Sequence, residues 1–306
     1  MLKPEGIIAA MITPFTPSQE VSVEALDEIV EYLVSAGVHG IFALGTNGEF
    51  ISLSDQEKLD VATRVVRAAR GRVPVYAGTG GVNTRQTMEF SRAMQDVGVD
   101  GLSLITPYFL PFTQDELEAH FLAVANTVSL PILVYNIPSR TGVHLQPRTL
   151  ARLAAVPNIV GIKDSSGDLQ NVVDYIEATD ENFSVLVGTD SLISFALFAG
   201  ASGAVAATTN IAPHLSVGIY EAWREGRTSD AVELQRRLGR VRTAIIRHGT
   251  LPASMKAAME LLGLPAGPPR APVAALNAEQ RRELEQIVDL CRPNPGGQEA
   301  YIEGGG

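Results

Sequence analysis

The sequence is poor in lysine and has no cluster of basic residues. Only four lysines stand among 306 residues, and 34 acidic residues outnumber 24 Lys and Arg residues. A nucleic-acid-binding protein needs a concentrated positive surface, so we expect no nucleic-acid partner. One or two well-placed cations inside an acidic protein are still enough to bind a small anionic substrate.

Cysteine and long apolar runs are also scarce. The single cysteine, Cys291, excludes a disulfide framework within the chain, which fits a reducing compartment. No apolar run reaches the roughly 18 residues that a membrane helix needs, and the stretch before Pro14 lacks the features of a signal peptide. The five histidines are scattered without metal-ligand spacing. We therefore expect a cytoplasmic protein that has no metal site and does not contact membranes.

Eight short apolar runs alternate with longer amphipathic stretches over residues 1–226. These runs are 6–12, 40–44, 73–78, 101–105, 131–136, 159–164, 183–188 and 203–207. Strands that are apolar on both faces and separated by helices are typical of a parallel sheet. Eight such units favour closure into a (β/α)8 TIM barrel. Periodicity alone leaves an open doubly wound sheet as the alternative, although no dinucleotide-binding glycine motif follows the first strand.

The pattern changes after residue 227, where strand-like runs end. Helical segments are expected at 228–248, 252–262 and 277–291. They predict a C-terminal three-helix appendage over residues 227–292, attached to a catalytic barrel at 1–226. Residues 293–306 show no periodicity, and we expect them to form a disordered tail.

The strand-like run IVGIKD, residues 159–164, contains the only strand lysine, Lys163. Burying an unpaired ammonium group is costly. One interpretation is therefore an ion pair with Asp164 or Asp190. The other is a desolvated amine that attacks a carbonyl and forms a Schiff base. Alternation along the strand places Gly161 on the same face, where its missing side chain would leave room for Lys163. The chemistry of the residues leaves both interpretations open.

The loop after the second strand reads ALGTNGEF, residues 43–50. Gly45 and Gly48 allow a tight turn whose backbone N–H groups face an anion, and Thr46 adds a hydroxyl group. The carboxylate of a 2-keto acid would suit such a turn. An ordinary loop closed by glycines is the alternative.

The fifth strand ends in VYNIPSRTG, residues 134–142. In a barrel, Tyr135 would lie next to the sixth strand and so next to Lys163, where its phenol can relay protons. Arg140 has the fork geometry that binds a carboxylate. The alternatives are an ordinary strand aromatic for Tyr135 and a surface salt bridge for Arg140.

Five motifs together resemble one known family. GTNGEF, TPYF, YNIPSRTG, GIKDSSGD and GAVAATTN stand in the order and spacing of the dihydrodipicolinate synthase/N-acetylneuraminate lyase family of class I aldolases. The resemblance covers residues 4–292. It implies a (β/α)8 barrel with a C-terminal helical region, a homotetramer built as a dimer of dimers, and chemistry on pyruvate bound as a Schiff base. It also implies that no metal or organic cofactor is required.

The resemblance assigns roles to five positions of this sequence. Lys163 matches the Schiff-base lysine, and Tyr135 matches the tyrosine that shuttles protons. Thr46 matches the hydroxyl residue of the loop, and its backbone with that of Asn47 would hold the pyruvate carboxylate. Val205 matches a residue whose backbone carbonyl faces the bound keto acid.

Three positions bear on the second substrate. Arg140 falls where synthases bind the second carboxylate, which favours condensation of pyruvate with aspartate-semialdehyde to 4-hydroxy-tetrahydrodipicolinate. Asn47 replaces a second threonine, and Phe109 replaces a tyrosine that joins the proton relay across a subunit interface. These two changes favour the alternative, an aldolase that cleaves 4-hydroxy-2-oxoglutarate or a 2-keto-3-deoxy sugar acid to pyruvate and an aldehyde. A non-catalytic paralogue that binds keto acids is a further alternative.

Overall fold

Eight parallel strands close into a barrel in the computed structural model, which describes residues 2–292. The strands are β1 (Gly6–Ala10), β2 (Gly40–Ala43), β3 (Val75–Gly78), β4 (Gly101–Ile105), β5 (Ile132–Asn136), β6 (Ile159–Asp164), β7 (Ser184–Val187) and β8 (Gly203–Ala206). Each strand pairs with the next, and β1 pairs with β8 to close the ring. The predicted (β/α)8 barrel is confirmed, and the open sheet, which would leave edge strands unpaired, is excluded.

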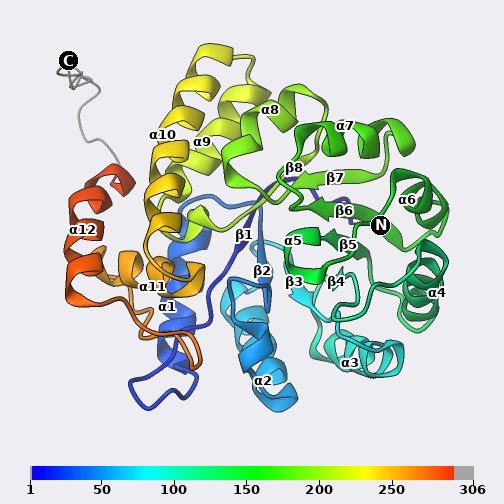
Figure 1. Cartoon of the computed structure of the whole chain (residues 1–306), viewed down its shortest axis with the longest axis horizontal. Coiled ribbons are helices and arrows are strands. Elements are labelled where there is room, and N and C mark those ends of the chain that lie inside the picture. The colour runs from blue at the N-terminus through cyan, green and yellow to red at the C-terminus, as the bar shows by residue number, and fades with distance from the viewer. Residues whose placement is uncertain (1, 293–306) are drawn as a thin grey trace.

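Helices surround the strands (Figure 1). They are α1 (Val23–Ser35), α2 (Asp55–Ala69), α3 (Thr84–Val97), α4 (Gln114–Ala125), α5 (Pro138–Thr141), α6 (Pro147–Ala154), α7 (Leu169–Ala178), α8 (Ile193–Phe198) and α9 (Pro213–Arg224). Short 3-10 turns occur at Phe50–Ser52, Asp190–Leu192 and Thr208–Asn210. Because every helix returns the chain to the same end of the barrel, the carboxyl ends of all eight strands meet at one mouth.

Local sequence explains where the helices begin and end. Ser54 and Glu57 form a capping box at the start of α2, in which each side chain bonds the other's backbone N–H. At the end of α3, Gly98 adopts φ +89°, a left-handed conformation that glycine reaches without a Cβ clash.

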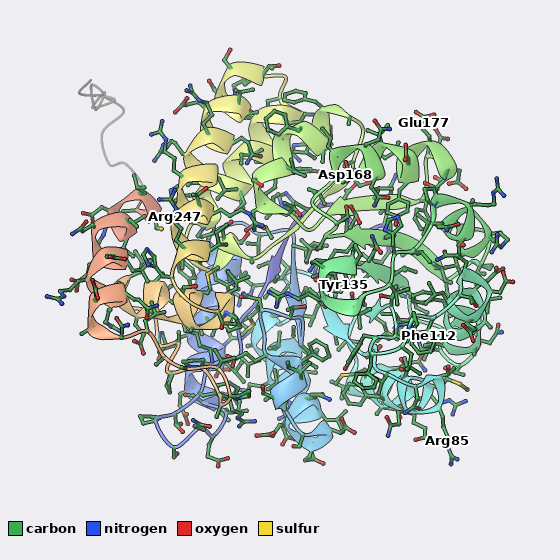
Figure 2. All side chains as sticks on the ribbon, viewed as in Figure 1. Arg85, Phe112, Tyr135, Asp168, Glu177 and Arg247 are labelled. Atoms are coloured by element: carbon green, nitrogen blue, oxygen red, sulfur yellow. The ribbon has the colours of Figure 1, made fainter. Side chains whose placement is uncertain are left out.

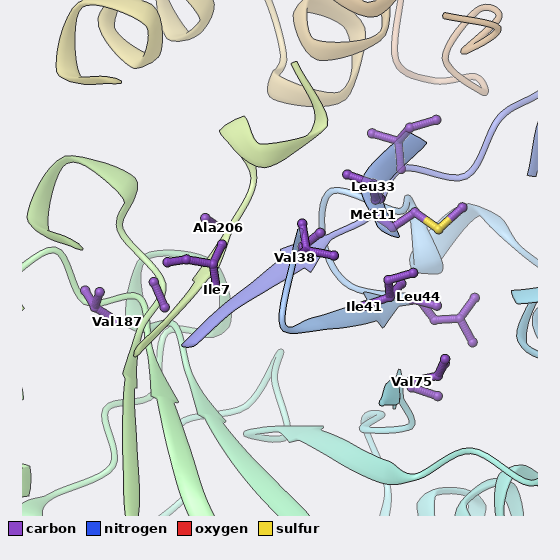
Figure 3. Close-up of a cluster of buried hydrophobic side chains, with 14 of the residues drawn as sticks. Ile7, Met11, Leu33, Val38, Ile41, Leu44, Val75, Val187 and Ala206 are labelled. Atoms are coloured by element: carbon purple, nitrogen blue, oxygen red, sulfur yellow. The ribbon is translucent and has the colours of Figure 1, made fainter. Parts of the chain in front are cut away.

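The strands bury both of their faces. Inside the barrel, a small apolar cluster includes Ile8, Phe42, Leu133, Leu186 and Val205. The alternate strand residues point outward and pack on the apolar faces of the helices in the main core. Figure 3 shows part of this core around β1 and β2. The two faces explain why the strands read as continuous apolar runs.

The appendage consists of α10 (Thr228–Arg247), α11 (Leu251–Leu261) and α12 (Ala278–Val288), and a 3-10 turn at Asp289–Cys291 follows. These helices lie at one side of the ring, with α10 beside α9 (Figure 1). They confirm the predicted three-helix appendage. The disorder expected for residues 293–306 lies outside the described residues. No helix in the described range has the length and hydropathy to span a bilayer.

Candidate active site

Lys163 and Tyr135 lie side by side at the barrel mouth. They are paired in register on β6 and β5, and their side chains are 5% and 4% exposed. The Lys163 Nζ atom lies 4.2 Å from the centroid of the Tyr135 ring and 4.8 Å from that of Phe42. Figure 2 places Tyr135 near the middle of the barrel, beside α5. The structure thus brings the strand lysine and the strand tyrosine together.

The ion-pair interpretation of Lys163 does not hold in this structure. The Asp164 carboxylate instead accepts hydrogen bonds from Asn136 Nδ2 at 2.7 Å and Ser166 Oγ at 2.5 Å. The Asp190 carboxylate accepts the backbone N–H groups of Ala207 and Thr208. Within residues 2–292, no carboxylate oxygen lies within 4.0 Å of Lys163 Nζ. Its partners are aromatic faces rather than a counter-charge.

The glycine whose missing side chain leaves space for the Lys163 side chain is Gly188, whereas alternation along β6 predicts Gly161. A Cβ atom on Gly161 would meet the backbone of Ser184 and the side chain of Leu133, so Gly161 serves close packing between strands. A Cβ atom on Gly188 would lie 2.9 Å from Lys163 Cε. Gly188 follows β7, which lies next to β6 in the barrel. The expectation for Gly161 was therefore wrong, because the free space lies across the sheet rather than along the strand.

The turn after β2 presents backbone N–H groups. Within the described part of the chain, neither the Thr46 N–H nor the Asn47 N–H has a hydrogen-bond acceptor. The Asn47 side chain is buried and donates through Nδ2 to the Ala10 carbonyl at 2.9 Å. Thr13 Oγ1 donates to the Gly48 carbonyl at 2.7 Å and holds the turn against β1. Two free N–H groups on a fixed turn are suited to an anion.

A small hollow connects this turn with the tyrosine. Its lining includes Thr46, Phe42, Ser103, Ile105 and Tyr135. The Ser103 hydroxyl is buried and has no hydrogen-bond partner among the described residues. Our sequence analysis missed Ser103, although a serine within the apolar run of β4 was a signal.

Tyr108 was also missed. Its ring packs against the cluster of Ile105, Tyr135 and Ile137, and burial raises the pKa of its phenol. Phe109, the next residue, behaves differently: its side chain is 90% exposed and its backbone has φ +84°. Such a conformation is uncommon for a bulky residue.

Val205 and Arg140, the other two residues indicated by the sequence, differ from each other in exposure. Val205 is on β8, paired with Ile8 and buried in the barrel interior. Arg140 is exposed on the one-turn helix α5, which directly follows β5. Within residues 2–292, its guanidinium forms no ion pair, so it is available to a ligand at the mouth.

Comparisons with known proteins agree with this architecture. A model of the dihydrodipicolinate synthetase family matches residues 3–290. A 4-hydroxy-tetrahydrodipicolinate synthase of Methanopyrus kandleri is 41% identical over 289 residues, covering 92% of this chain and 96% of that protein.

Solved structures share the fold over nearly the whole chain. Dihydrodipicolinate synthase DapA-2 of Bacillus anthracis has a TM-score of 0.92 at 32% identity, covering 94% of this chain and 99% of its own. YagE of E. coli K12, a prophage protein of the dihydrodipicolinic acid synthase family solved in complex with pyruvate, has a TM-score of 0.90 at 32% identity, with 94% and 98% covered. This chain belongs to the dihydrodipicolinate synthetase family.

Proposed function

We propose that this protein is a pyruvate-dependent lyase that works through a Schiff base on Lys163, most simply as a 4-hydroxy-tetrahydrodipicolinate synthase in the cytoplasm. The observation that carries the proposal is the burial of Lys163 beside Tyr135 without a carboxylate in reach. The Lys163 amine thus lies directly against the phenol ring that would transfer protons at the imine. Further support comes from the names of relatives at 34 to 41% identity.

The reaction begins with addition of the Lys163 amine to the keto carbon of pyruvate. The keto oxygen leaves as water, and an imine forms. Loss of a proton from the methyl carbon gives an enamine, with the imine as the electron sink. The enamine carbon attacks the aldehyde carbon of aspartate-semialdehyde, and the aldehyde oxygen takes a proton. The amino group of that substrate then attacks the imine carbon, closes the ring and releases Lys163.

The remaining groups of the mouth have distinct tasks in this proposal. Tyr135, with Thr46 across the hollow, transfers protons at the imine and at the new carbon–carbon bond. The free N–H groups of Thr46 and Asn47 bind the pyruvate carboxylate. Val205 on β8 offers its backbone carbonyl to the bound keto acid.

Borohydride reduction in the presence of pyruvate tests the Schiff base. We expect the intact protein to gain the mass of one reduced pyruvate, and Lys163→Ala to gain none. Lys58→Ala is the control, because Lys58 lies on the outer helix α2, where it pairs with Asp55, and this variant must still give the adduct. No adduct on the unchanged protein, or full adduct on Lys163→Ala, contradicts the proposal.

Arg140 gives a second prediction. Arg140→Ala should raise the KM for aspartate-semialdehyde by about tenfold or more, because a forked hydrogen bond to its carboxylate is lost. The KM for pyruvate should change by less than about twofold. Arg148→Ala, at an exposed position on α6, is the control. Equal losses for both substrates would assign Arg140 another role.

The aldolase alternative rests on Asn47 and Phe109. Phenylalanine has no hydroxyl group to pass a proton, and the Phe109 side chain is exposed to solvent. Phe109 therefore cannot serve as a proton donor at the barrel mouth. Rates with aspartate-semialdehyde, 4-hydroxy-2-oxoglutarate and 2-keto-3-deoxygluconate decide between the two reactions. A higher kcat/KM for either keto acid would make the protein an aldolase with the same Lys163 chemistry.

A further inference from the structure

A buried ion pair joins the C-terminal appendage to the turn after β2. Lys256 on α11 is 1% exposed, and Glu49 is 3% exposed. The Lys256 Nζ atom lies 2.6 Å from Glu49 Oε1, donates to the Pro268 carbonyl at 3.1 Å, and sits 3.9 Å from the centroid of the Phe15 ring. The Lys256 ammonium is therefore enclosed by protein groups on several sides.

Glu49 belongs to the same turn as the two free N–H groups. Its backbone N–H donates to the Thr46 carbonyl at 3.2 Å, and its φ angle is +53°. A glutamate in this left-handed conformation is strained, so the surrounding structure must hold it there. The backbone of Glu49 is therefore hydrogen-bonded to the turn that carries the Thr46 and Asn47 N–H groups.

The appendage holds the Glu49 carboxylate from a second side. Arg270, in the loop after α11, donates its backbone N–H to Glu49 Oε2 at 2.9 Å. The Arg270 guanidinium in turn bonds the Ser52 carbonyl at 2.8 Å and the Glu57 carboxylate at 2.7 Å. Each oxygen of the Glu49 carboxylate thus lies next to a group of the appendage, Oε1 next to the Lys256 ammonium and Oε2 next to the Arg270 N–H.

Stability alone does not account for this pair. Removing two charges from water costs about as much as their attraction returns, and apolar residues of similar size are often at least as stable. Strain at Glu49 adds to that cost. An apolar pair would lack the charge attraction that draws the Glu49 carboxylate, and the turn that carries it, toward the appendage.

We propose that Lys256 and Glu49 are a positioning pair, through which the appendage holds the turn after β2 in the conformation that binds the substrate carboxylate. The proposal rests on the function proposed above. It assigns the appendage a part in substrate binding, although no residue of the appendage lines the hollow beside Tyr135.

The test compares Lys256→Met, Glu49→Gln and the double variant by borohydride trapping across a range of pyruvate concentrations. In Lys256→Met the pyruvate concentration for half-maximal trapping should rise by about tenfold, while the yield at saturation stays the same. In the double variant this pyruvate concentration should be no higher than in the more affected of the two single variants, because the two residues act as one unit. Lys3→Met, at an exposed lysine, is the matched control.

The outcomes separate this proposal from the function. Absence of the adduct on the unchanged protein contradicts the Schiff base. An adduct with unchanged half-saturation in the variants contradicts the positioning pair. Lys256→Met leaves a buried carboxylate unpaired; if it does not fold, the double variant, which removes both charges, carries the test. Additive effects of the two substitutions also contradict the pair.

Hydrogen exchange tests the hold on the turn without any substrate. We expect the hydrogen-bonded amides of residues 49 and 52, which donate to the Thr46 and Glu49 carbonyls, to exchange faster in the double variant than in the unchanged protein, with no change in Lys3→Met. Unchanged exchange in the turn would overturn the proposal, whatever the enzyme's activity.

The pH dependence of pyruvate binding gives a further test, because it should not change if the pair of Lys256 and Glu49 only stabilised the fold. Burial lowers the pKa of Lys256 to about 8, although the negative charge of Glu49 opposes this shift. The other charged groups nearby are Arg270 and Glu260, and Glu57 lies next to Arg270. Loss of the Lys256 proton removes its attraction to Glu49. In the unchanged protein, the pyruvate concentration for half-maximal trapping should therefore rise as the pH passes about 8. In Lys256→Met this rise near pH 8 should be absent.

Discussion

The Lys163 amine lies against the faces of Tyr135 and Phe42, and the carboxylates of Asp164 and Asp190 are engaged elsewhere. That a lysine stands in an apolar strand was visible in the sequence. That its carbon chain passes over Gly188 was not, because Gly188 follows the neighbouring strand β7 and lies 25 positions farther along the chain. An unusual residue type can be recognised from its neighbours in the sequence. The space around its side chain depends instead on the register between strands, here between β6 and β7.

Gly188→Ala tests this contact. The new Cβ would lie 2.9 Å from Lys163 Cε and 2.0 Å from Ser165 Oγ, so one of these side chains must move. We expect the rate of borohydride trapping with pyruvate to fall by about tenfold or more, because the amine leaves its attacking position. Gly239→Ala, in α10 with open space around it, is the control and should trap at the unchanged rate. Equal rates for both variants would mean that Gly188 does not position Lys163.

At the scale of elements, the start of α2 combines a local and a distant interaction. The capping box of Ser54 and Glu57 is a local interaction, because both residues fall within one helical turn. The ion pair of Glu57 with Arg270 is not, since 213 positions separate them. Arg270 also stacks on Phe15 at 4.4 Å. One carboxylate thus caps α2 and ties it to the appendage.

Glu57→Gln gives a pH-dependent prediction. Hydrogen bonds from Arg270 lower the pKa of Glu57 from 4.5 to about 2. A carboxyl group whose pKa is lower in the folded state stabilises the fold above its unfolded pKa, and this contribution is lost as the pH falls. At pH 7 the variant should lose about 1–2 kcal/mol of unfolding free energy, and the difference should vanish between pH about 4.5 and about 2.

Thermal unfolding of both proteins across this pH range measures the effect of Glu57→Gln. The control is Glu89→Gln, whose partner Arg85 is 89% exposed and whose ion pair should contribute little. A difference for Glu57→Gln that persists unchanged to pH 2 would exclude the charged pair as its origin.

At the scale of the whole molecule, the barrel mouth carries apolar groups that a lone chain leaves in solvent. Phe109 is 90% exposed and Leu110 is 56% exposed, next to each other in the loop after β4. Adjacent exposed apolar residues of this size are typical of a surface that meets a partner. The family resemblance implies that the partner is a second copy of this chain.

Light scattering tests the homotetramer. We expect a mass of four times 32.6 kDa, and a smaller species for Phe109→Glu, because the added charge would be buried in an interface. Val23→Glu, at another exposed apolar residue on α1, is the control. A mass of one chain for the unchanged protein would show that Phe109 is free in solution.

The amino-acid sequence by itself determined the order of strands and helices and the appendage, and it favoured a closed barrel, because apolar runs, helix periodicity and caps act over a few residues. It also indicated Lys163 and Tyr135, since a lysine and a strand-end tyrosine stand out locally. Only the tertiary structure decided that Gly188 makes room for Lys163, and that Lys256 pairs with Glu49. Lys256 and Glu49 are 207 positions apart, and no local pattern of charge or hydrophobicity encodes a contact that forms only when the appendage closes against the barrel.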